Sequence, residues 1–313
     1  MERLERAVQA VKAALPDLTL LEHEPLHAHS SFHIGGEARV LALPADGESF
    51  CALCALLHEQ GLRPFVLGNG SNLLFPDEGL PLAFLVGAER LQELRLLPDG
   101  AVYAGAGVSL SRLAAFACEN KLDGLVFASG IPGSVGGGVR MNAGAYGGEL
   151  KDAVERVYAW DLQEQRLREF AGGDCGFGYR RSVFQSGRWA ILGARFRLRP
   201  GAREEIAAAM RELGEKRREK QPLELPSAGS AFKRPEGYFA AALIDQAGLK
   251  GLRVGGAQVS EKHAGFIVNA GGASARDVRA LMAQVQETVF ARFGVRLEPE
   301  IIALEPSLSS EID

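Results

Sequence analysis

The chain has 313 residues, of which 47% are hydrophobic and 24% charged, and its formal net charge is −4. This length favours two or three domains, and the composition is that of an ordinary water-soluble globular protein. The small negative charge gives no electrostatic basis for binding nucleic acid or an anionic membrane. The charged first residues do not resemble a signal peptide, and no stretch is apolar enough to span a bilayer. We therefore expect a cytoplasmic protein without membrane insertion.

Hydrophobic periodicity and turn residues predict the secondary structure in chain order. The predicted elements are an opening helix that ends at Pro16, a helix over 49–60, strands at 64–67, 83–86 and 101–104, a helix over 110–120, mainly strands over 154–198, a charged helix over 204–220, and a last helix from Ser274 to Gly294. The charged run 215–220 is typical of a solvated helix face. Strands and helices mix without strict alternation, which indicates an α+β fold.

The four cysteines give little evidence for redox or metal chemistry. Cys51 and Cys54 form a C-x-x-C pair, but neither Cys118 nor Cys175 lies in a partner cluster. We expect the pair to be small buried residues of the helix over 49–60, with a redox motif as the less favoured alternative and no metal.

Two glycine-rich segments are candidates for binding an anion. They are Gly68-Asn69-Gly70-Ser71-Asn72-Leu73-Leu74 and Gly130-Ile131-Pro132-Gly133-Ser134-Val135-Gly136-Gly137-Gly138. Backbone N–H groups in such turns can hold a phosphate, although glycines after a strand often serve only a tight turn. Neither segment matches the dinucleotide or P-loop pattern, so an anion site of either of those types is not indicated.

Two other segments carry candidate polar groups. Arg180 follows Tyr179 in the segment over 175–182 and could hold a carboxylate, although a surface ion pair is the commoner role of arginine. Ser230 lies in Pro226-Ser227-Ala228-Gly229-Ser230. A plain turn is the default interpretation of that segment, because it lacks the esterase elbow and a flanking His/Asp pair.

The order of these blocks resembles the UDP-N-acetylenolpyruvoylglucosamine reductase family. The blocks that match are Leu67–Leu74, Gly130–Gly137, Met141–Gly148, Gln221-Pro222, Pro226–Ser230, Ala247–Gly251, Gly255–Ala257, His263-Ala264 and Leu297–Glu300, within about 31–303. The resemblance implies an α+β fold with a two-part FAD-binding domain of the vanillyl-alcohol-oxidase/PCMH type and an α+β substrate-binding domain. We expect divisions at 1–88, 89–200 and 201–313, a monomer, and the shorter subclass that lacks an extra tyrosine loop.

By this resemblance the chain uses NADPH and bound FAD to reduce UDP-N-acetylenolpyruvoylglucosamine to UDP-N-acetylmuramate. Arg180 would hold the substrate carboxylate, Glu300 would help to polarise it, and Ser230 would give the proton to the α-carbon. The expected substrate-binding residues are Tyr179, Lys233 and His263, and a structural role is the alternative for His263. The expected FAD-binding residues are Gly68, Asn69, Gly70, Ser71, Asn72, Leu73, Gly130, Ile131, Gly133, Ser134, Gly136, Gly137, Asn142 and Gly144.

Some positions depart from the family pattern and put peripheral contacts in doubt. They are His33 before Ile34-Gly35-Gly36, Arg234 after Lys233, the pair Ala241-Ala242, and Ile302 two residues after Glu300. Two alternatives stay open: an FAD-dependent oxidase or dehydrogenase on the same fold, and a non-catalytic flavin- or nucleotide-binding relative.

Overall fold

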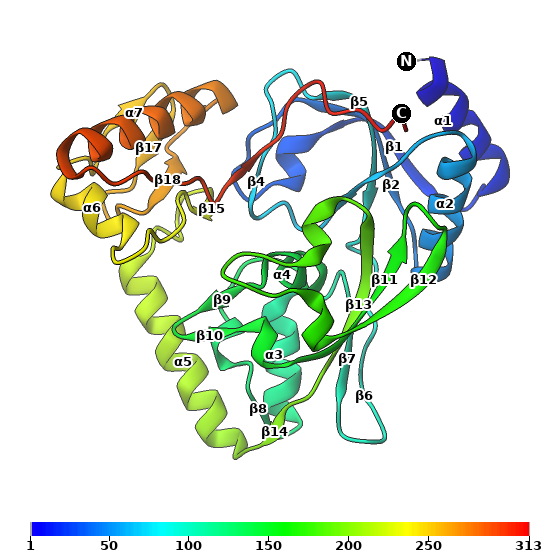
Figure 1. The fold of residues 1–313 in the computed structure, drawn as a ribbon, viewed down its shortest axis with the longest axis horizontal. Helices are drawn as coiled ribbons and strands as arrows, with labels where there is room; N and C mark the ends of the chain where they lie inside the picture. The colour runs from blue at the N-terminus through cyan, green and yellow to red at the C-terminus, as the bar shows by residue number, and fades with distance from the viewer. Residues whose placement is uncertain (1, 313) are drawn as a thin grey trace.

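The computed structural model describes residues 2–312 and contains three main sheets (Figure 1). The first sheet has the order β1-β2-β5-β3, formed by Thr19–Pro25, Glu37–Leu43, Leu80–Gly87 and Phe65–Leu67. Alternate residues of its strands face opposite sides, as the two-residue period of a strand requires. Val40 and Val86 pack in one core with helices α1 (Glu2–Ala14) and α2 (Gly47–Glu59), whereas Leu41 and Leu85 belong to a second core.

The second sheet is antiparallel and has the order β12-β11-β13-β7-β6. Its strands are Arg166–Ala171, Val154–Asp161, Trp189–Phe196, Val102–Gly105 and Leu94–Leu96. Helices α3 (Leu110–Glu119) and α4 (Val135–Met141) pack beside it, and their apolar residues share one continuous core with α1 and α2. Two short strand pairs, β8 (Leu122–Asp123) with β14 (Arg199–Pro200) and β9 (Gly144–Ala145) with β10 (Gly148–Glu149), complete this part.

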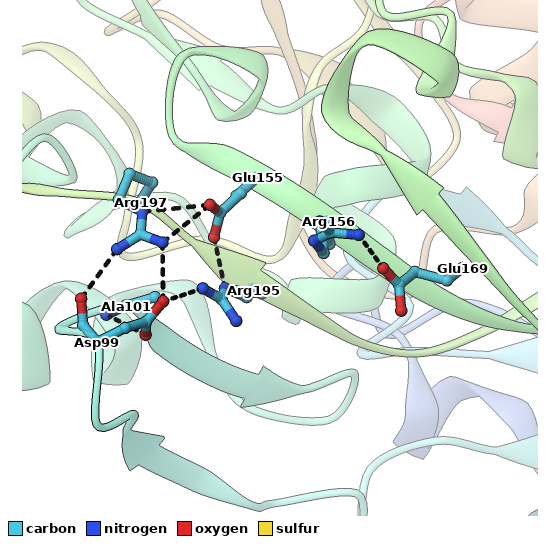
Figure 2. Close-up of polar contacts among 7 residues, drawn as sticks. All are labelled: Asp99, Ala101, Glu155, Arg156, Glu169, Arg195 and Arg197. Carbon is cyan, nitrogen blue, oxygen red and sulfur yellow. Dashed lines mark hydrogen bonds and ion pairs between the residues drawn. The ribbon is translucent and has the colours of Figure 1, made fainter.

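An ion-pair network joins the β6–β7 turn to the second sheet (Figure 2). Arg197 donates from Nη2 to Asp99 Oδ2 and to Glu155 Oε1, each at 2.9 Å, and Arg195 pairs with the same two carboxylates. The arginines come from the end of the β13 segment, Glu155 from β11 and Asp99 from the turn. Asp99 and Arg197 are exposed, and Arg195 and Glu155 are partly buried. The network stabilises the strand connections, and none of its four residues lines the cavity described below.

A long helix, α5 (Arg203–Lys220), leads into the third part (Figure 1). Its sheet has the order β15-β18-β17-β16, formed by Ser227–Ser230, Phe266–Asn269, Ala257–Val259 and Arg253–Val254. Helices α6 (Ala240–Gln246) and α7 (Ala275–Phe293) cover it, and their apolar residues belong to a separate core. Ser274 begins α7 with a capping box and Gly294 ends it, as the sequence predicts.

The chain then returns to the first part of the molecule. Strand β19 (Ile302–Ala303) pairs in parallel with β4 (Leu73–Leu74), which forms the end of the first glycine segment. Figure 1 shows the red final segment running from the third part past β4 toward α1. Within residues 2–312, no helix has the length and apolar character needed to cross a membrane.

Most of the predicted elements are present with small shifts at their ends. The sequence reasoning missed α4, which begins inside the second glycine segment, and α6 with the short strands around it. Cys51 and Cys54 both lie on α2, as predicted. Burial raises the pKa of the Cys51 thiol to about 11 and raises that of Cys54 further. Both thiols therefore stay protonated at neutral pH, which disfavours the redox alternative.

Candidate active site

The three parts of the molecule surround one cavity of about 680 Å³, within the range of small-molecule and cofactor sites. Both glycine segments line it, and so do Arg180, Ser230 and Glu300. These residues come from all three parts of the chain, and the fold brings them to one surface.

Arg180 and Glu300 meet directly in this cavity. Arg180 Nε donates to Glu300 Oε1 at 2.5 Å, and the two side chains are only 19% and 13% exposed. A second guanidinium nitrogen, Nη2, donates to the carbonyl of Gly144 at 3.1 Å. The Arg180 guanidinium is therefore held in a fixed orientation by two different acceptors.

A tight turn presents Arg180. The backbone groups of Gly178 and Arg181 exchange two hydrogen bonds, at 3.0 and 3.1 Å, which places Tyr179 and Arg180 at the tip. Arg180 adopts a left-handed φ of +54°, which is uncommon for a residue with a side chain. Gln185 Nε2 donates to the Arg180 carbonyl at 3.0 Å and helps to hold this conformation. Such strain is often found where a side chain must be aimed at a ligand.

Ser230 reaches the cavity through an irregular strand end. Strand β15 shifts register against β18 between Ser227 and Ser230, and Gly229 within that shift has a φ of +75°. A bulge of this kind changes the direction of the following side chain. The exposed Ser230 consequently lines the same cavity as Arg180 and Glu300. Beyond it, Ala231 accepts a hydrogen bond from the Glu300 amide at 2.9 Å, which ties the serine and glutamate segments together.

The two glycine segments lie against each other. Ser71 Oγ donates to the carbonyl of Pro132 at 3.1 Å. Within residues 2–312, the amide N–H groups of Asn69, Gly70 and Ser71 donate to no acceptor. Free amides on a turn suit an anionic group such as a pyrophosphate. Gly70 allows this turn because its φ is +59° and because a Cβ at this position would lie 1.9 Å from the His29 carbonyl.

Most of the predicted FAD-binding residues line the cavity. Those that do are Gly68, Asn69, Gly70, Ser71, Asn72, Leu73, Ile131, Gly133, Ser134, Gly136, Gly137 and Gly144. Gly130 and Asn142 do not line it. Asn142 is buried, and its side chain bonds to Gly178, Glu149 and the Lys151 amide, which gives it a role in holding the Arg180 turn.

Tyr179, Lys233 and His263 lie outside the cavity lining. Tyr179 Oη accepts a hydrogen bond from the Arg234 amide at 3.0 Å, so this residue connects the second and third parts of the molecule. Lys233 pairs with Glu298 at 3.3 Å. Burial lowers the pKa of His263, and its Nδ1 accepts from the Gly265 amide at 3.1 Å, which favours the structural alternative for this histidine.

Arg217 was predicted to lie on a solvated face, and for this residue the prediction is wrong. Arg217 lines the cavity, and its Nε and Nη1 are buried without a hydrogen-bond partner within residues 2–312. Burial lowers the pKa of its guanidinium. The other charged residues of the run are exposed. The helical period shows which residues share a face, but it does not show which face meets the cavity, so nothing in the sequence set Arg217 apart.

The residues present fit a bound FAD. A buried cation without a partner destabilises the folded protein, and so do amide N–H groups that lack acceptors, unless a ligand supplies the acceptors. Arg217 and the first glycine segment provide such donors on the cavity wall, and Arg63 Nε is a further buried donor without a partner within residues 2–312. Of the departures from the family pattern, Ile302 lines the cavity as an apolar residue and pairs with Leu73.

Comparisons with known proteins agree with this geometry. A model described as an FAD binding domain matches residues 38–167, and one described as the C-terminal domain of UDP-N-acetylenolpyruvoylglucosamine reductase matches residues 221–304. The solved UDP-N-acetylenolpyruvylglucosamine reductase from Thermus caldophilus is 36% identical, with a TM-score of 0.78 over 92% of this chain and 99% of that one. The protein is therefore an FAD-dependent oxidoreductase, and the predicted fold class is confirmed.

Relatives with the same name cover almost the whole chain. The reductase from Caldanaerobacter subterraneus subsp. tengcongensis is 45% identical over 296 residues, 94% of this chain and 96% of that protein. The reductase from Agathobacter rectalis is 47% identical over 305 residues, with the same coverage. The chain belongs to the UDP-N-acetylenolpyruvoylglucosamine reductase family, the UDP-N-acetylmuramate dehydrogenases of peptidoglycan precursor synthesis.

Proposed function

We propose that this protein reduces UDP-N-acetylenolpyruvoylglucosamine to UDP-N-acetylmuramate with NADPH as hydride donor, as a cytoplasmic monomer. The convergence of Arg180, Ser230 and Glu300 on one cavity with the FAD-binding segments is the observation that carries the proposal. An enzyme that oxidises small alcohols on the same fold has no need of this combination. The three proposed domains are 1–88, 89–200 and 201–313.

When held by the glycine segments, FAD reduced by NADPH would supply the hydride for the terminal CH₂ carbon of the enolpyruvyl group. Negative charge then develops toward the α-carbon and its carboxylate, so the site needs fixed donors beside that carboxylate. Arg180 supplies them, because its guanidinium is already held by Glu300 and by the Gly144 carbonyl. Glu300 keeps this guanidinium in place, and both side chains are largely removed from water, where charge–charge interactions are stronger.

Ser230 donates the proton that completes the reduction at the α-carbon. A serine hydroxyl is a weak acid, so this role requires close positioning and stabilisation of the oxygen that remains. The register shift at Gly229 and the tie between Ala231 and Glu300 hold Ser230 at the cavity wall. Both features fix the serine relative to the Arg180–Glu300 pair.

A stopped-flow experiment under anaerobic conditions tests this assignment. NADPH should bleach the flavin absorbance of the wild-type protein, and the enolpyruvyl substrate should restore it. Ser230→Ala should leave the first step within about threefold and slow the second by about 10²–10⁴-fold, the usual contribution of general acid catalysis. Equal loss of both steps would contradict the role of Ser230. A reduced flavin that only oxygen reoxidises would favour the oxidase alternative.

A further inference from the structure

Ser230 lies on an edge strand of the third sheet, and a segment from the first part of the molecule holds that edge. Within residues 2–312, β15 has a strand neighbour, β18, on one side only. Ser31 meets its free side: the Ser227 amide donates to the Ser31 carbonyl at 3.1 Å, and the Ser31 hydroxyl donates to the Ser227 carbonyl at 2.7 Å. These two serines are 196 positions apart in the chain, and the chemistry proposed above gives Ser31 no role.

The same segment also contacts β18 and the core of the third part. Asn269, the last residue of β18, donates from Nδ2 to the Phe32 carbonyl at 3.3 Å, and its amide donates to the Pro226 carbonyl at 2.8 Å. The Phe32 side chain is fully buried in the core of the third part, although the residue itself comes from the first. Ser31 and Phe32 therefore hold both of the strands between which the register shift redirects Ser230.

The other end of this segment packs against the first glycine segment. The His29 carbonyl lies so close to Gly70 that a Cβ on this glycine would be 1.9 Å from it. His29 is itself anchored, because its Nε2 lies 2.7 Å from Glu24 Oε1. From His29 to Ser31 the chain spans at most about 7 Å. A short, anchored stretch of backbone therefore joins the turn that suits a pyrophosphate to the strand that carries Ser230.

The first part of the molecule holds Glu300 by a different route. Asn72 Nδ2 donates to the Glu300 carbonyl at 3.1 Å, and β19 then pairs with β4. Farther along the chain, Ser310 fills a gap in the first sheet between Arg63 and Phe84. Its carbonyl accepts from the Arg63 amide at 2.6 Å, and its hydroxyl accepts from the Phe84 amide at 2.8 Å. These contacts fix Glu300 relative to the first glycine segment.

Ser230 is thus held on both sides. The Ala231 carbonyl ties the residue after it to the Glu300 amide at 2.9 Å, and Ser31 ties the strand before it. The hydride and the proton have to reach neighbouring carbons of one substrate molecule, so the Ser230 hydroxyl needs a fixed position relative to the cofactor. A displacement of about 1 Å can slow such a reaction by about 10²-fold.

We propose that Ser31 is a positioning residue for the proton transfer: its bonds to Ser227 align Ser230 with the flavin-binding turn at Gly70. This inference rests on the role of Ser230 under the proposed function. Ser31 does not line the cavity, so it acts through β15. Removal of the Ser31 hydroxyl leaves the backbone bond from the Ser227 amide in place, so the expected loss is smaller than that of a full displacement.

Single-turnover kinetics of the flavin-loaded protein test this role. The variants are Ser31→Ala, Ser31→Thr, Ser230→Ala and the double variant Ser31→Ala/Ser230→Ala. The control is Ser111→Ala, because Ser111 is exposed and its hydroxyl meets that of Ser109 at 3.2 Å, away from β15. Each protein is reduced with NADPH under anaerobic conditions and then reoxidised with UDP-N-acetylenolpyruvoylglucosamine. Its flavin content and its urea unfolding midpoint are measured as well.

Ser31→Ala should slow the substrate-dependent reoxidation by about tenfold and leave the reduction by NADPH within about twofold of wild type. Ser31→Thr, which keeps a hydroxyl, should retain reoxidation within about threefold, and Ser111→Ala should retain both wild-type rates. The double variant should be no slower than Ser230→Ala, because Ser31 acts through the hydroxyl that this background lacks.

An unchanged rate of reoxidation in Ser31→Ala would overturn the proposal. Equal slowing of both steps together with a lower urea midpoint would also overturn it, because it would show general destabilisation. A further loss in the double variant would do the same, since Ser31 would then act on something other than Ser230. If Ser230→Ala itself kept the wild-type rate of reoxidation, the proposed role of Ser230 would be wrong, and this inference would fall with it.

Discussion

The ion pair between Arg180 and Glu300 allows a quantitative test of the active site. Its atoms lie 2.5 Å apart, and both side chains are less than one-fifth exposed. Two unit charges at about 4 Å interact by about 4 kcal/mol at an effective dielectric constant of about 20, and desolvation offsets part of this. We expect a coupling free energy of about 2 kcal/mol between these residues in the second half-reaction.

A double-mutant cycle measures this coupling. Wild type, Arg180→Gln, Glu300→Gln and the double variant are reduced with NADPH, and the rate of substrate-dependent flavin reoxidation is followed in single turnovers. Each single variant should slow this step by about 10²-fold. A coupling of about 2 kcal/mol corresponds to about 30-fold, so the double variant should be only about threefold slower than either single variant. Reduction by NADPH should change by less than about threefold in all four proteins.

Arg181→Gln serves as the matched control, because Arg181 is the exposed neighbour of Arg180 in the same turn. It should retain the wild-type rate in both steps. If the losses of the two single variants simply multiplied in the double variant, Arg180 and Glu300 would act independently, and the argument from their contact would be refuted. Circular dichroism of each variant checks that the fold is retained.

Two further variants test the fold around the cavity. In Gly70→Ala the new Cβ would lie 1.9 Å from the His29 carbonyl. This variant should lower the free energy of unfolding by about 2–4 kcal/mol and reduce the flavin content after purification. The control Gly173→Ala, whose Cβ would have no atom within 4 Å, should change neither quantity. Burial alone would raise the pKa of Asp161, but hydrogen bonds from Arg188 and from two amides lower it below its ordinary value. The stabilising contribution of Asp161 is therefore present above the ordinary pKa of an aspartate and is lost as the pH falls through the lowered pKa. Asp161→Asn should therefore cost about 2–3 kcal/mol at pH 7 and less at pH 2, as measured in urea titrations at both pH values. An equal loss at both would contradict this assignment.

The catalytic and cofactor-binding residues could be predicted from the sequence more completely than the other residues that line the cavity. The glycine segments, Arg180, Ser230 and Glu300 occur in recognisable blocks because their roles demand particular residue types at particular places. The structure brings twelve predicted cofactor residues into the cavity lining with them.

Arg217 and the final segment could not be recognised in the same way. Arg217 stands in a charged run whose other members face solvent, and only the packing of α5 beside the second glycine segment turns it toward the cavity, where its guanidinium lies against Gly130. The pairing of Ser310 with Arg63 and Phe84 depends on long-range contacts that leave no local pattern. Short strands such as β16 and β17 were missed for a related reason, because two or three residues are too few to show a period.

The place of Ser310 in the first sheet also affects the order in which the protein can fold during synthesis. Phe84 and Ser310 are separated by 226 positions in the chain. At about 5–20 residues per second, a ribosome needs about 11–45 s to make the intervening chain, while amino-terminal domains generally begin to fold as they emerge. For that interval the gap between Arg63 and Phe84 stays open to water or to other extended chains, and a nascent chain shorter than 310 residues cannot close it with its own segment.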